Sequence, residues 1–392
     1  MRKLPLLAAA FGLLALSLLI DGHAGQNHLD IRIRVAAGDI TVDETPAGSI
    51  IAARASSGLV RLEDAGKPAI PYRIVQVLVP KGERVVGVTA SARTTETIAR
   101  GVRPALASGV AAQPDAERSS LAPADTPVAP DDGSGEYPSQ LTRYLGTGTW
   151  HGYSIASIAV FPVRVTDTGA VTLHTEVDVR IELAASNEFN TASRARRASP
   201  RAASEIRAAV ASRVENADAI ATYPAPRVTP HDRAFAASSL PSEDGSPVDY
   251  LIITTSALEP SFQVLADWKT AKGVATQVRT VDWIEANSRH GSDLTETIRF
   301  FLQDAYANWG VRYVLLAGDT PEIPPRYLYS TYYYGGSQVP ADIYFACLDG
   351  TFNADGDTQF GEQPVDAPDL YPELVVGRLP VSDPETADIV EI

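Results

Sequence analysis

The segment Tyr313-Val-Leu-Leu-Ala-Gly-Asp319 decides the fold class of the C-terminal part of the chain. Its five apolar residues are typical of a strand that is buried on both faces, as in a parallel sheet. Similar strands precede it at Tyr250 to Thr255 and at Val274 to Val278, and helical patterns separate the three. Strands that alternate with helices predict a parallel sheet with helices on its faces. In such sheets functional groups gather beyond the carboxyl ends of the strands, where Asp319 lies.

Two amphipathic helices are expected between these strands. The first covers Ser261 to Lys272, and Gly273 ends it. Its apolar side is predicted to carry Phe262, Leu265 and Trp268. The second begins at a capping box of Asp293 and Glu296 and ends at Gly310. A further strand is predicted at Val375-Val376.

An acidic loop near the C-terminal end is the sharpest local signal of a binding site. Five oxygen-bearing side chains fall within fourteen residues: Asp349, Asn353, Asp355, Asp357 and Glu362. Calcium takes six to eight oxygen ligands, and a loop bent at glycines can wrap several of them around one ion. Clustered carboxylates without a cation repel one another. We therefore predict a Ca²⁺ site with Asp355, Asp357 and Glu362 as its central ligands; the alternative is a solvated turn rich in Asp and Asn.

The spacing of this loop is not that of an EF-hand, because Thr358 stands where that motif requires glycine. The net charge of the whole C-terminal end also favours cation binding. From Ala341 to Ile392 there are twelve Asp and Glu residues against a single Arg, in a chain whose net charge is −15. This acidic end argues against nucleic acid as a partner and favours cations.

The N-terminus is predicted to be an export signal, residues 1–24. Arg2 and Lys3 precede an apolar run from Leu4 to Ile20, and small residues follow at Gly22-His-Ala24. A membrane anchor is the alternative, although this run is short for a bilayer span. We expect a secreted or cell-surface protein with no membrane span once the signal is removed. One cysteine, Cys347, excludes intrachain disulfides, which makes stabilisation by a metal more plausible.

Residues 27–186 are predicted to form a β-sandwich. Segments of period two occur at 29–35, 72–80, 155–165 and 171–183, without helical patterns between them. The stretch from Gly101 to Glu136, rich in Ala, Pro, Ser and Asp, is expected to be a mobile insertion. A generic adhesive or carbohydrate-binding sandwich is the alternative to any more specialised role.

Residues 187–247 have the composition of a linker, with a short helix at Ala203 to Val214. The basic cluster Arg194-Ala-Arg-Arg197 is suited to proteolytic processing, or it is only a solvated basic run. Residues 248–392 then form the α/β domain.

Cys347 and His290 invite a catalytic dyad, but their settings argue against one. Cys347 lies in an apolar run, which favours a buried small hydrophobe, and His290 lies in a polar loop. The remaining histidines, His23, His28, His151, His174 and His231, share no metal-ligand spacing. Asp319, Glu322 and Asp342 are expected as turn formers or caps, and Tyr327 to Tyr334 as an aromatic loop over the sheet edge.

Three sequence segments follow one another in the C-terminal part. They are the strand ending in Gly318-Asp319, the run Asp342 to Asp349 with its acidic loop, and Pro372-Glu-Leu-Val-Val-Gly-Arg-Leu-Pro380. This order resembles the first half of the catalytic domain of the gingipain family of cysteine peptidases, a caspase-like α/β fold. Gly66-Lys-Pro-Ala-Ile-Pro71 and Trp150-His-Gly-Tyr153 are similar to parts of that family's prodomain.

The resemblance implies an exported zymogen piece of a cysteine endopeptidase, in which an intramolecular prodomain covers the active-site groove. It also implies calcium in the matching loop, and protein or peptide substrates for the full-length enzyme. The family's catalytic His and Cys are expected beyond Ile392, so no catalytic residue is assigned within this sequence. Two rivals remain: a secreted, calcium-stabilised binding or adhesion protein without catalysis, and a different hydrolase that uses Asp319.

Overall fold

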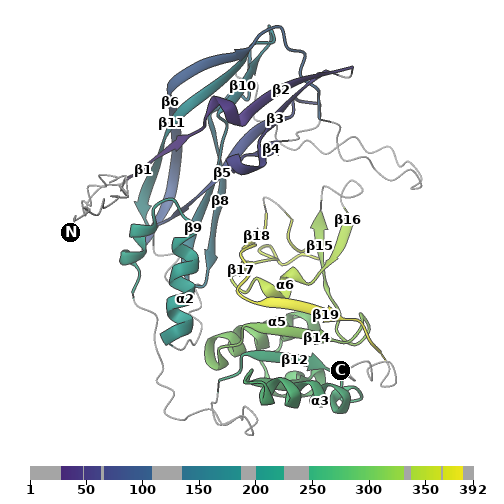
Figure 1. Cartoon of the computed structure of the whole chain (residues 1–392). Coiled ribbons are helices and arrows are strands. Elements are labelled where there is room, and N and C mark those ends of the chain that lie inside the picture. Colours follow the sequence, from purple (N-terminus) through teal and green to yellow (C-terminus); the bar gives the residue numbers. More distant parts are fainter. Residues whose placement is uncertain are drawn as a thin grey trace, which may run out of the picture.

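The computed structural model describes residues 28–46, 48–62, 66–107, 135–186, 200–224, 247–330, 337–362 and 365–382. Figure 1 shows a strand-rich N-terminal part above a C-terminal part of strands and helices. The predicted signal peptide, the basic cluster at 194–197 and most of the predicted insertion at 101–136 lie outside the described residues. Among the residues that are described, none of the helices has the length and apolar character needed to cross a bilayer.

Two antiparallel sheets form most of the N-terminal part. The first contains β1 (His28–Arg34), β6 (Glu83–Ala99), β7 (Glu136–Tyr137), β10 (Val163–Thr166) and β11 (Val171–Ala185). The second contains β4 (Val60–Leu62), β5 (Ile70–Leu78), β8 (Thr142–Trp150) and β9 (Tyr153–Val160). A separate hairpin pairs β2 (Ile40–Thr45) with β3 (Gly48–Ala53), and short 3-10 turns lie at η1 (Ala37–Asp39) and η2 (Ala55–Ser57).

The two sheets enclose one hydrophobic core, which agrees with the predicted sandwich. Ile33 near the end of β1, Val77 on β5 and Ile158 on β9 all belong to this single buried cluster. The predicted strand at 155–165 is in fact two strands, β9 and β10. The break falls at Phe161-Pro162, because a proline has no N–H to donate to a sheet ladder.

The longest strand, β6, is not predicted by the sequence pattern. Its second half, residues 89–97, consists mainly of Thr, Ser, Arg and Glu, and most of these side chains are exposed. The strand exists because it pairs with β11 along almost its whole length, from Glu83 opposite Ala185 to Ala99 opposite Val171. Alternation of apolar and polar residues requires that one face of a strand is buried. A strand that is held mainly by backbone pairing, with both faces in contact with solvent, does not show it.

Residues 200–224, inside the interval expected to be a linker, pack against the end of the sandwich. They form helix α2 (Pro200–Ala211), near the predicted position, and the 3-10 helix η3 (Ala217–Thr222). Val210 and Tyr223 share a buried cluster with Leu78 of β5. Asn216 closes the contact, because its amide accepts from the Leu78 N–H (2.7 Å) and donates to the Leu78 carbonyl (2.9 Å).

The C-terminal part is built on a parallel sheet of four strands in the order β13-β12-β14-β19. These are β12 (Tyr250–Thr254), β13 (Thr276–Thr280), β14 (Tyr313–Ala317) and β19 (Val375–Leu379). The helices between them are α3 (Glu259–Ala271), α4 (Val281–Asn287) and α5 (Leu294–Asp304), and α5 continues as a π-helical turn, η4 (Ala305–Trp309). The predicted alternation of strands and helices is therefore confirmed, and α4 is an element that the sequence pattern does not predict.

Helices cover both faces of this sheet. Leu251 and Ile253 of β12 face the cluster that contains Ile298 of α5, while Ile252 between them faces Phe262 of α3. One expectation for α3 is wrong, because Trp268 is 51% exposed. The residues that α3 buries are Phe262, Ala266 and Thr270, four residues apart, and this row leaves Trp268 on the outer side.

The predicted capping box at the start of α5 is present in a modified form. The Asp293 carboxylate accepts from the Glu296 N–H (2.8 Å), and the Glu296 carboxylate accepts from the Ser292 N–H (2.6 Å). Both Asp293 oxygens also bind the guanidinium of Arg326 at 2.7 Å. This ion pair connects the start of α5 to the chain that follows β14.

The chain between β14 and β19 makes a small lobe beyond the sheet. It contains β15 (Arg326–Ser330), β16 (Ser337–Ala341), α6 (Ile343–Ala346), β17 (Gly350–Thr351) and β18 (Ala367–Pro368). The predicted aromatic loop is thus partly a strand, since Tyr327 and Tyr329 lie on β15 and pair with β16. Residues 331–334 of that prediction lie outside the described residues.

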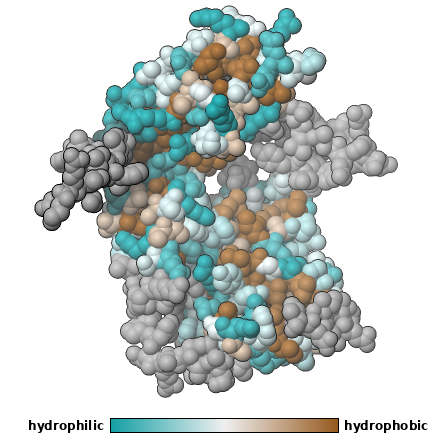
Figure 2. All heavy atoms as spheres, viewed as in Figure 1, coloured by the Kyte–Doolittle hydropathy of each residue, from teal (hydrophilic) through white to brown (hydrophobic). Residues whose placement is uncertain are grey.

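Strand β19 is an outer strand of the parallel sheet, paired on one side with β14. Its side chains are poorly covered, with Val375 58% and Leu379 42% exposed. In the view of Figure 1, Figure 2 shows apolar side chains on the part of the surface where β19 lies. Among the residues that the structure describes, the other edge of this strand is unpaired, and an apolar strand with a free edge can accept a further strand.

Candidate functional site

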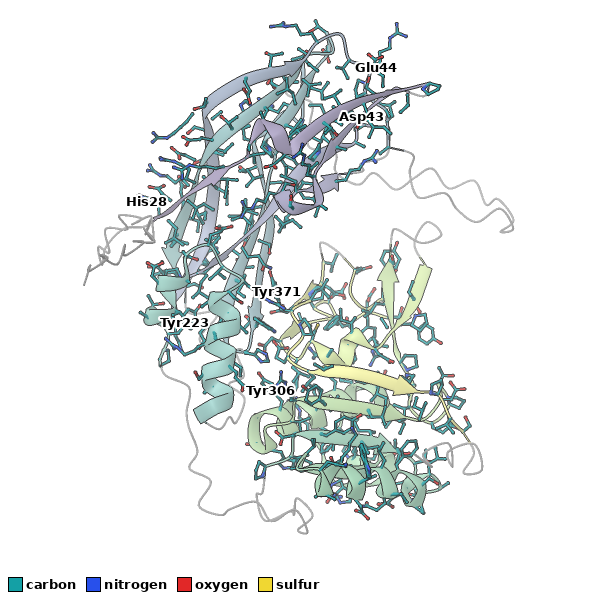
Figure 3. The ribbon with its side chains drawn as sticks, in the orientation of Figure 1. His28, Asp43, Glu44, Tyr223, Tyr306 and Tyr371 are labelled. Atoms are coloured by element: carbon teal, nitrogen blue, oxygen red, sulfur yellow. The ribbon has the colours of Figure 1, made fainter. Side chains whose placement is uncertain are left out.

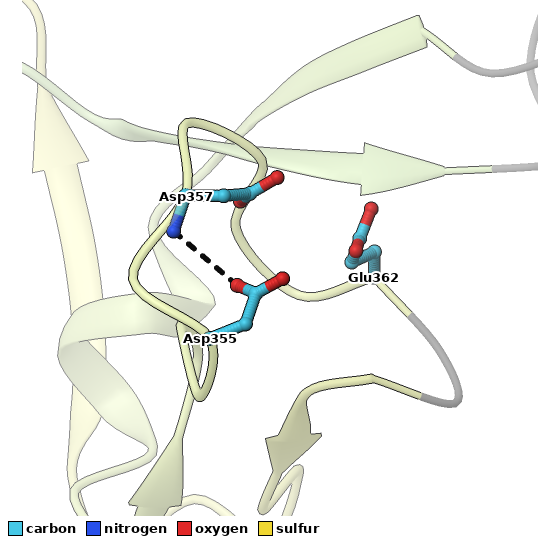
Figure 4. Close-up of side chains that lie close together, drawn as sticks. All are labelled: Asp355, Asp357 and Glu362. Carbon is cyan, nitrogen blue, oxygen red and sulfur yellow. Dashed lines mark hydrogen bonds between the residues drawn. The ribbon is translucent and has the colours of Figure 1, made fainter.

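Three of the five predicted calcium ligands come together in the acidic loop. One carboxylate oxygen of each of Asp355, Asp357 and Glu362 lies within 4.8 Å of the other two, as Figure 4 shows. The Asp357 N–H donates to the Asp355 carboxylate (3.3 Å), which fixes the two aspartates on one turn. Partial burial and the charges of Asp357 and Asp355 raise the pKa of Glu362. The loop thus presents converging negative charge to solvent.

Asn353 and Asp366 shape this loop from inside. The Asn353 side chain donates to the Asp357 carbonyl (3.0 Å) and accepts from the N–H of Gly356, which has the left-handed φ of +78°. Asp366, 5% exposed, accepts from the N–H groups of Ala354 (2.5 Å), Gly361 (2.7 Å) and Glu362 (3.2 Å). Asp366 is a structural residue that the sequence analysis did not single out, because its partners lie up to twelve residues away.

The fifth predicted ligand, Asp349, is in a different place. It is 3% exposed and lies close to Glu373, a residue with the same exposure that the sequence did not indicate. One Glu373 oxygen accepts from the Leu348 N–H (2.8 Å), and the other has no hydrogen-bond partner among the described residues. Burial raises the pKa of Glu373 to about 8, and the nearby charge of Asp349 adds to the shift.

A third carboxylate, Asp369, belongs to the same neighbourhood. Burial raises the pKa of Asp369, and its charge in turn contributes to the raised pKa of Glu373. We call Asp349, Asp369 and Glu373 the inner acidic cluster. Burial together with the charges of two neighbouring carboxylates favours the protonated form of Glu373.

Arg299 brings a buried positive charge to this region. This α5 residue is 6% exposed, and its guanidinium donates to the carbonyls of Tyr344 (3.1 Å), Cys347 (2.9 Å) and Asp349 (3.2 Å). It therefore holds the backbone that leads into the acidic loop.

A hard divalent cation fits the donors of the exposed trio. Its three converging groups are carboxylate oxygens, which are the ligands that calcium prefers. In the inner acidic cluster, one buried Glu373 oxygen has no hydrogen-bond partner among the described residues. A cation there would offset the burial and the charge of Asp349 that raise the pKa of Glu373.

Cys347 is a core residue, as its apolar setting predicted. It is fully buried after α6, and burial, followed by the charges of Glu373 and Asp369, raises the pKa of its thiol to about 12. A nucleophilic cysteine needs the opposite environment, one that stabilises the thiolate. His290 is exposed in the loop before α5, so it does not share the buried setting of Cys347.

We expect Cys347 in the native chain to react with a disulfide reagent at pH 8 on the order of a thousandfold more slowly than in denaturant, since a pKa near 12 leaves little thiolate. The measurement is thiol labelling in buffer and in guanidinium chloride. Equal rates would mean that the thiol is neither buried nor protonated in solution.

The carboxyl edge of the sheet carries structural polar groups. Asp319 accepts from the Thr320 N–H with its side chain and from the Ile323 N–H with its carbonyl, so it forms the turn after β14. Asp342 makes a two-pronged ion pair with Arg378 of β19, both contacts at 2.8 Å. Arg378 also donates to two backbone carbonyls of the turn region, at residues 318 and 323. Asp319 thus has the expected role of a turn former, whereas the Asp342 side chain makes an ion pair and does not cap α6.

Comparison with known proteins gives one match to a family model and several remote structural similarities. No curated protein sequence matches the chain. The complex of the RgpB pro- and mature domains from Porphyromonas gingivalis is 15% identical, with a TM-score of 0.30, and the match covers 42% of this chain and 84% of that chain. A structure of gingipain K from Porphyromonas gingivalis, which concerns its zymogenic latency, is 15% identical with a TM-score of 0.23. That match covers 40% of this chain and 100% of that chain.

Dimeric latent PorU from Porphyromonas gingivalis is 14% identical with a TM-score of 0.26, and the match covers 93% of this chain but 37% of that chain. The family model matches residues 243–390, less than half of the chain, and it is described as peptidase family C25. The matched interval contains the parallel sheet, the acidic loop and the inner acidic cluster. Residues 243–390 are therefore similar to peptidase family C25, and this match supports the gingipain-type resemblance of the sequence.

Proposed function

We propose that the chain is the N-terminal piece of a secreted, cysteine-type endopeptidase zymogen. Residues 28–224 would be its prodomain, and residues 247–382 the first portion of a caspase-like catalytic domain. The observation that carries the proposal is the family C25 match over residues 243–390. The outer strand β19 supports it, because within the described part of the chain it pairs only with β14, and a larger catalytic sheet would continue by pairing with its other edge.

The described residues supply scaffold rather than nucleophile. Peptide hydrolysis by a cysteine peptidase needs a thiolate beside an imidazole, with N–H groups that stabilise the oxyanion. Cys347 is protonated and buried, so that thiolate would come from outside the described residues. Within the described residues, Arg378 and Asp342 would fix the carboxyl edge of the sheet, toward which the catalytic groups of such a domain project.

The test compares two proteins on a panel of fluorogenic peptides. We expect the 392-residue chain to be inactive, and a longer natural form that continues past Ile392 to become active after cleavage within residues 187–247. Turnover by the 392-residue chain that disappears in Cys347→Ala would overturn the proposal. A longer form without any thiol-dependent activity would favour the binding or adhesion protein instead.

We also propose calcium as the bound metal, at the exposed trio Asp355, Asp357 and Glu362 and at the inner acidic cluster. The converging oxygens of the trio and the orphaned oxygen of Glu373 support this assignment. When bound, calcium would supply positive charge that orders the loop and neutralises the buried carboxylates.

Calcium is expected to raise the melting temperature. If it binds only the folded state at about 100 times its dissociation constant, it adds about 2.7 kcal/mol to the free energy of unfolding. Differential scanning calorimetry with calcium and with EGTA measures the shift. We expect Asp355→Asn with Asp357→Asn to remove one binding event by titration calorimetry, and Glu373→Gln to remove the other. An identical melting curve in calcium and EGTA would remove the metal assignment.

Export is the remaining element of the proposal. The basic start and apolar run of residues 1–24 support a cleaved signal peptide. N-terminal sequencing of the protein recovered from the medium of an expressing cell would test it. A product that retains Met1 would contradict a cleaved signal.

A further inference from the structure

Tyr371, which lies just before β19, joins the C-terminal part to the N-terminal sandwich. Its hydroxyl accepts from the Gln76 side chain (2.9 Å) and bonds with the Ser157 hydroxyl (2.7 Å). Gln76 of β5 and Ser157 of β9 are opposite each other in the second sheet. Val75 and Val77, on either side of Gln76, belong to the sandwich core, so Gln76 points to the outer face. Figure 3 shows Tyr371 on the side of the C-terminal part that faces the sandwich.

The outer face of this sheet has room for the tyrosine ring. Gly148 of β8 is buried, and a Cβ added to it would overlap the Tyr371 ring. Gly148 pairs with Ile155 of β9, which belongs to the buried cluster that Tyr371 packs against. We call Gln76, Gly148, Ile155 and Ser157 the tyrosine socket. It accommodates the apolar ring and satisfies the hydroxyl, which are the two requirements of a buried tyrosine.

The turn between β8 and β9 adds two further bonds to the C-terminal part. The Trp150 indole N–H donates to the Pro372 carbonyl (3.0 Å), and His151 Nδ1 bonds with the hydroxyl of the fully buried Tyr306 (2.8 Å). The Arg213 guanidinium lies 4.1 Å from the centre of the Trp150 ring, so the chain that follows α2 supports this tryptophan. The contact therefore extends beyond the socket to both residues of the turn.

The C-terminal residues of these contacts all come before strands of the parallel sheet. Tyr371 and Pro372 precede β19, and Tyr306 precedes β14. Because β14 and β19 are parallel, these residues lie at the amino edge of the sheet. In Figure 1 the arrows of β12 and β19 point away from β8.

This edge is not the one at which a substrate is expected. In parallel sheets with helices on their faces, ligands bind beyond the carboxyl ends of the strands, where Asp319 lies. The gingipain resemblance implies a prodomain that covers the active-site groove. The contacts of the tyrosine socket and the β8–β9 turn lie at the opposite edge from such a groove.

We propose that the sandwich binds the C-terminal part at the amino edge of its sheet through the tyrosine socket, and that this binding does not need the covalent connection between the two parts. It rests on the proposed function in one respect, that the chain is cut between them. The partner is a tyrosine presented by the folded C-terminal part, and the carboxyl edge takes no part in the binding. At this surface the sandwich is an anchor for the C-terminal part rather than a cover for a substrate groove.

The experiment uses the whole chain with a site for a specific protease placed within residues 225–246, between the two parts. After cleavage, size-exclusion chromatography shows whether the two pieces stay together, and calorimetric dilution measures their dissociation constant. We expect the pieces to coelute at micromolar concentration. Elution as two separate peaks would overturn the proposal.

Gly148→Ala tests the tyrosine socket, because the added methyl group displaces the Tyr371 ring. We expect it to weaken association at least tenfold, and Tyr371→Phe, which removes only the hydroxyl, to weaken it severalfold. Gly87→Ala is the matched control in the same sandwich, because a Cβ there meets only the movable side chain of Glu182. Circular dichroism of the variants establishes that the sandwich still folds.

Thr320→Arg tests the place of the contact. Thr320 is exposed in the turn after β14, at the carboxyl edge, where an arginine would obstruct a bound partner. We expect association to be unchanged. In the uncut chain, hydrogen exchange of residues 147–157 should become faster in Gly148→Ala and stay the same in Thr320→Arg.

Each claim has its own contrary result. Unchanged association in Gly148→Ala would overturn the tyrosine socket. A loss in Thr320→Arg as large as that in Gly148→Ala would overturn the amino edge as the place of binding. The peptidase function fails separately, through a longer form without thiol-dependent activity, and that result leaves the association of the two pieces as measured.

Discussion

Replacement of Arg299 by methionine is expected to destabilise the C-terminal part by roughly 4 kcal/mol, which is large against a typical domain stability. The methionine fills a similar volume but cannot donate a hydrogen bond. The carbonyls of Tyr344, Cys347 and Asp349 would then lose their donor inside the protein. Each buried carbonyl left in this way costs about 1 to 3 kcal/mol, and the three costs overlap because the backbone can relax.

Tryptophan fluorescence during urea unfolding measures this effect well. Three of the four tryptophans, Trp268, Trp283 and Trp309, lie in the C-terminal part. Arg312→Met is the matched control, because Arg312 is an exposed arginine next to β14 whose side chain rests on the Tyr313 ring. We expect the control to change stability by less than about 0.5 kcal/mol. A loss below about 1 kcal/mol in Arg299→Met would show that the three carbonyls find water or other donors.

The sequence predicts the parallel sheet because its signals are local. Buried strands such as β14 are short apolar runs, and the start of α5 is marked by Asp293 three residues before Glu296. The same local reasoning gives the acidic trio, since Asp355, Asp357 and Glu362 are neighbours along the chain. The local pattern gives the wrong position for Trp268. When apolar residues occur on two sides of a helix, their spacing does not show which side faces the sheet.

The inner acidic cluster could not be predicted in the same way. Asp349 and Glu373 are separated by 24 positions, and the turns that join them are set by β17, β18 and Asp366. Glu373 sits in the sequence as a lone acid before an apolar strand, a position usually exposed to solvent. The contact of Gly148 with Tyr371 is still more distant in sequence, and a glycine in a strand carries no signal of what packs against it.

In the presence of a chelator, the C-terminal part is expected to lose stability as the pH rises from about 4.5 to about 8. The pKa of Glu373 is raised to about 8 in the folded protein from an ordinary 4.5, so between these values the folded state binds more protons than the unfolded state. The contribution of Glu373 to stability is therefore complete below pH 4.5 and falls as the pH passes toward 8, by roughly 1 kcal/mol per pH unit. The raised pKa of Asp369 acts in the same direction.

The raised pKa of Glu362 also acts in this direction. The pKa of Asp293, which Arg326 and the Glu296 N–H lower against the effect of burial, affects stability only below its ordinary value of 3.8. Urea unfolding at intervals between pH 4.5 and 8, with EGTA present throughout, measures the profile. Glu373→Gln should remove most of the slope, while the exposed control Glu285→Gln should keep it.

Excess calcium should flatten the profile, because an ion that neutralises Glu373 removes the reason for keeping its proton. A flat profile in EGTA would mean that water or a protein cation already reaches the buried carboxylate, and the cluster would then have no need of a metal. A steep profile that calcium leaves unchanged would mean that the charge is buried but the cavity does not admit the ion. The pH dependence of stability with and without calcium thus distinguishes a metal site from a merely strained acidic pair.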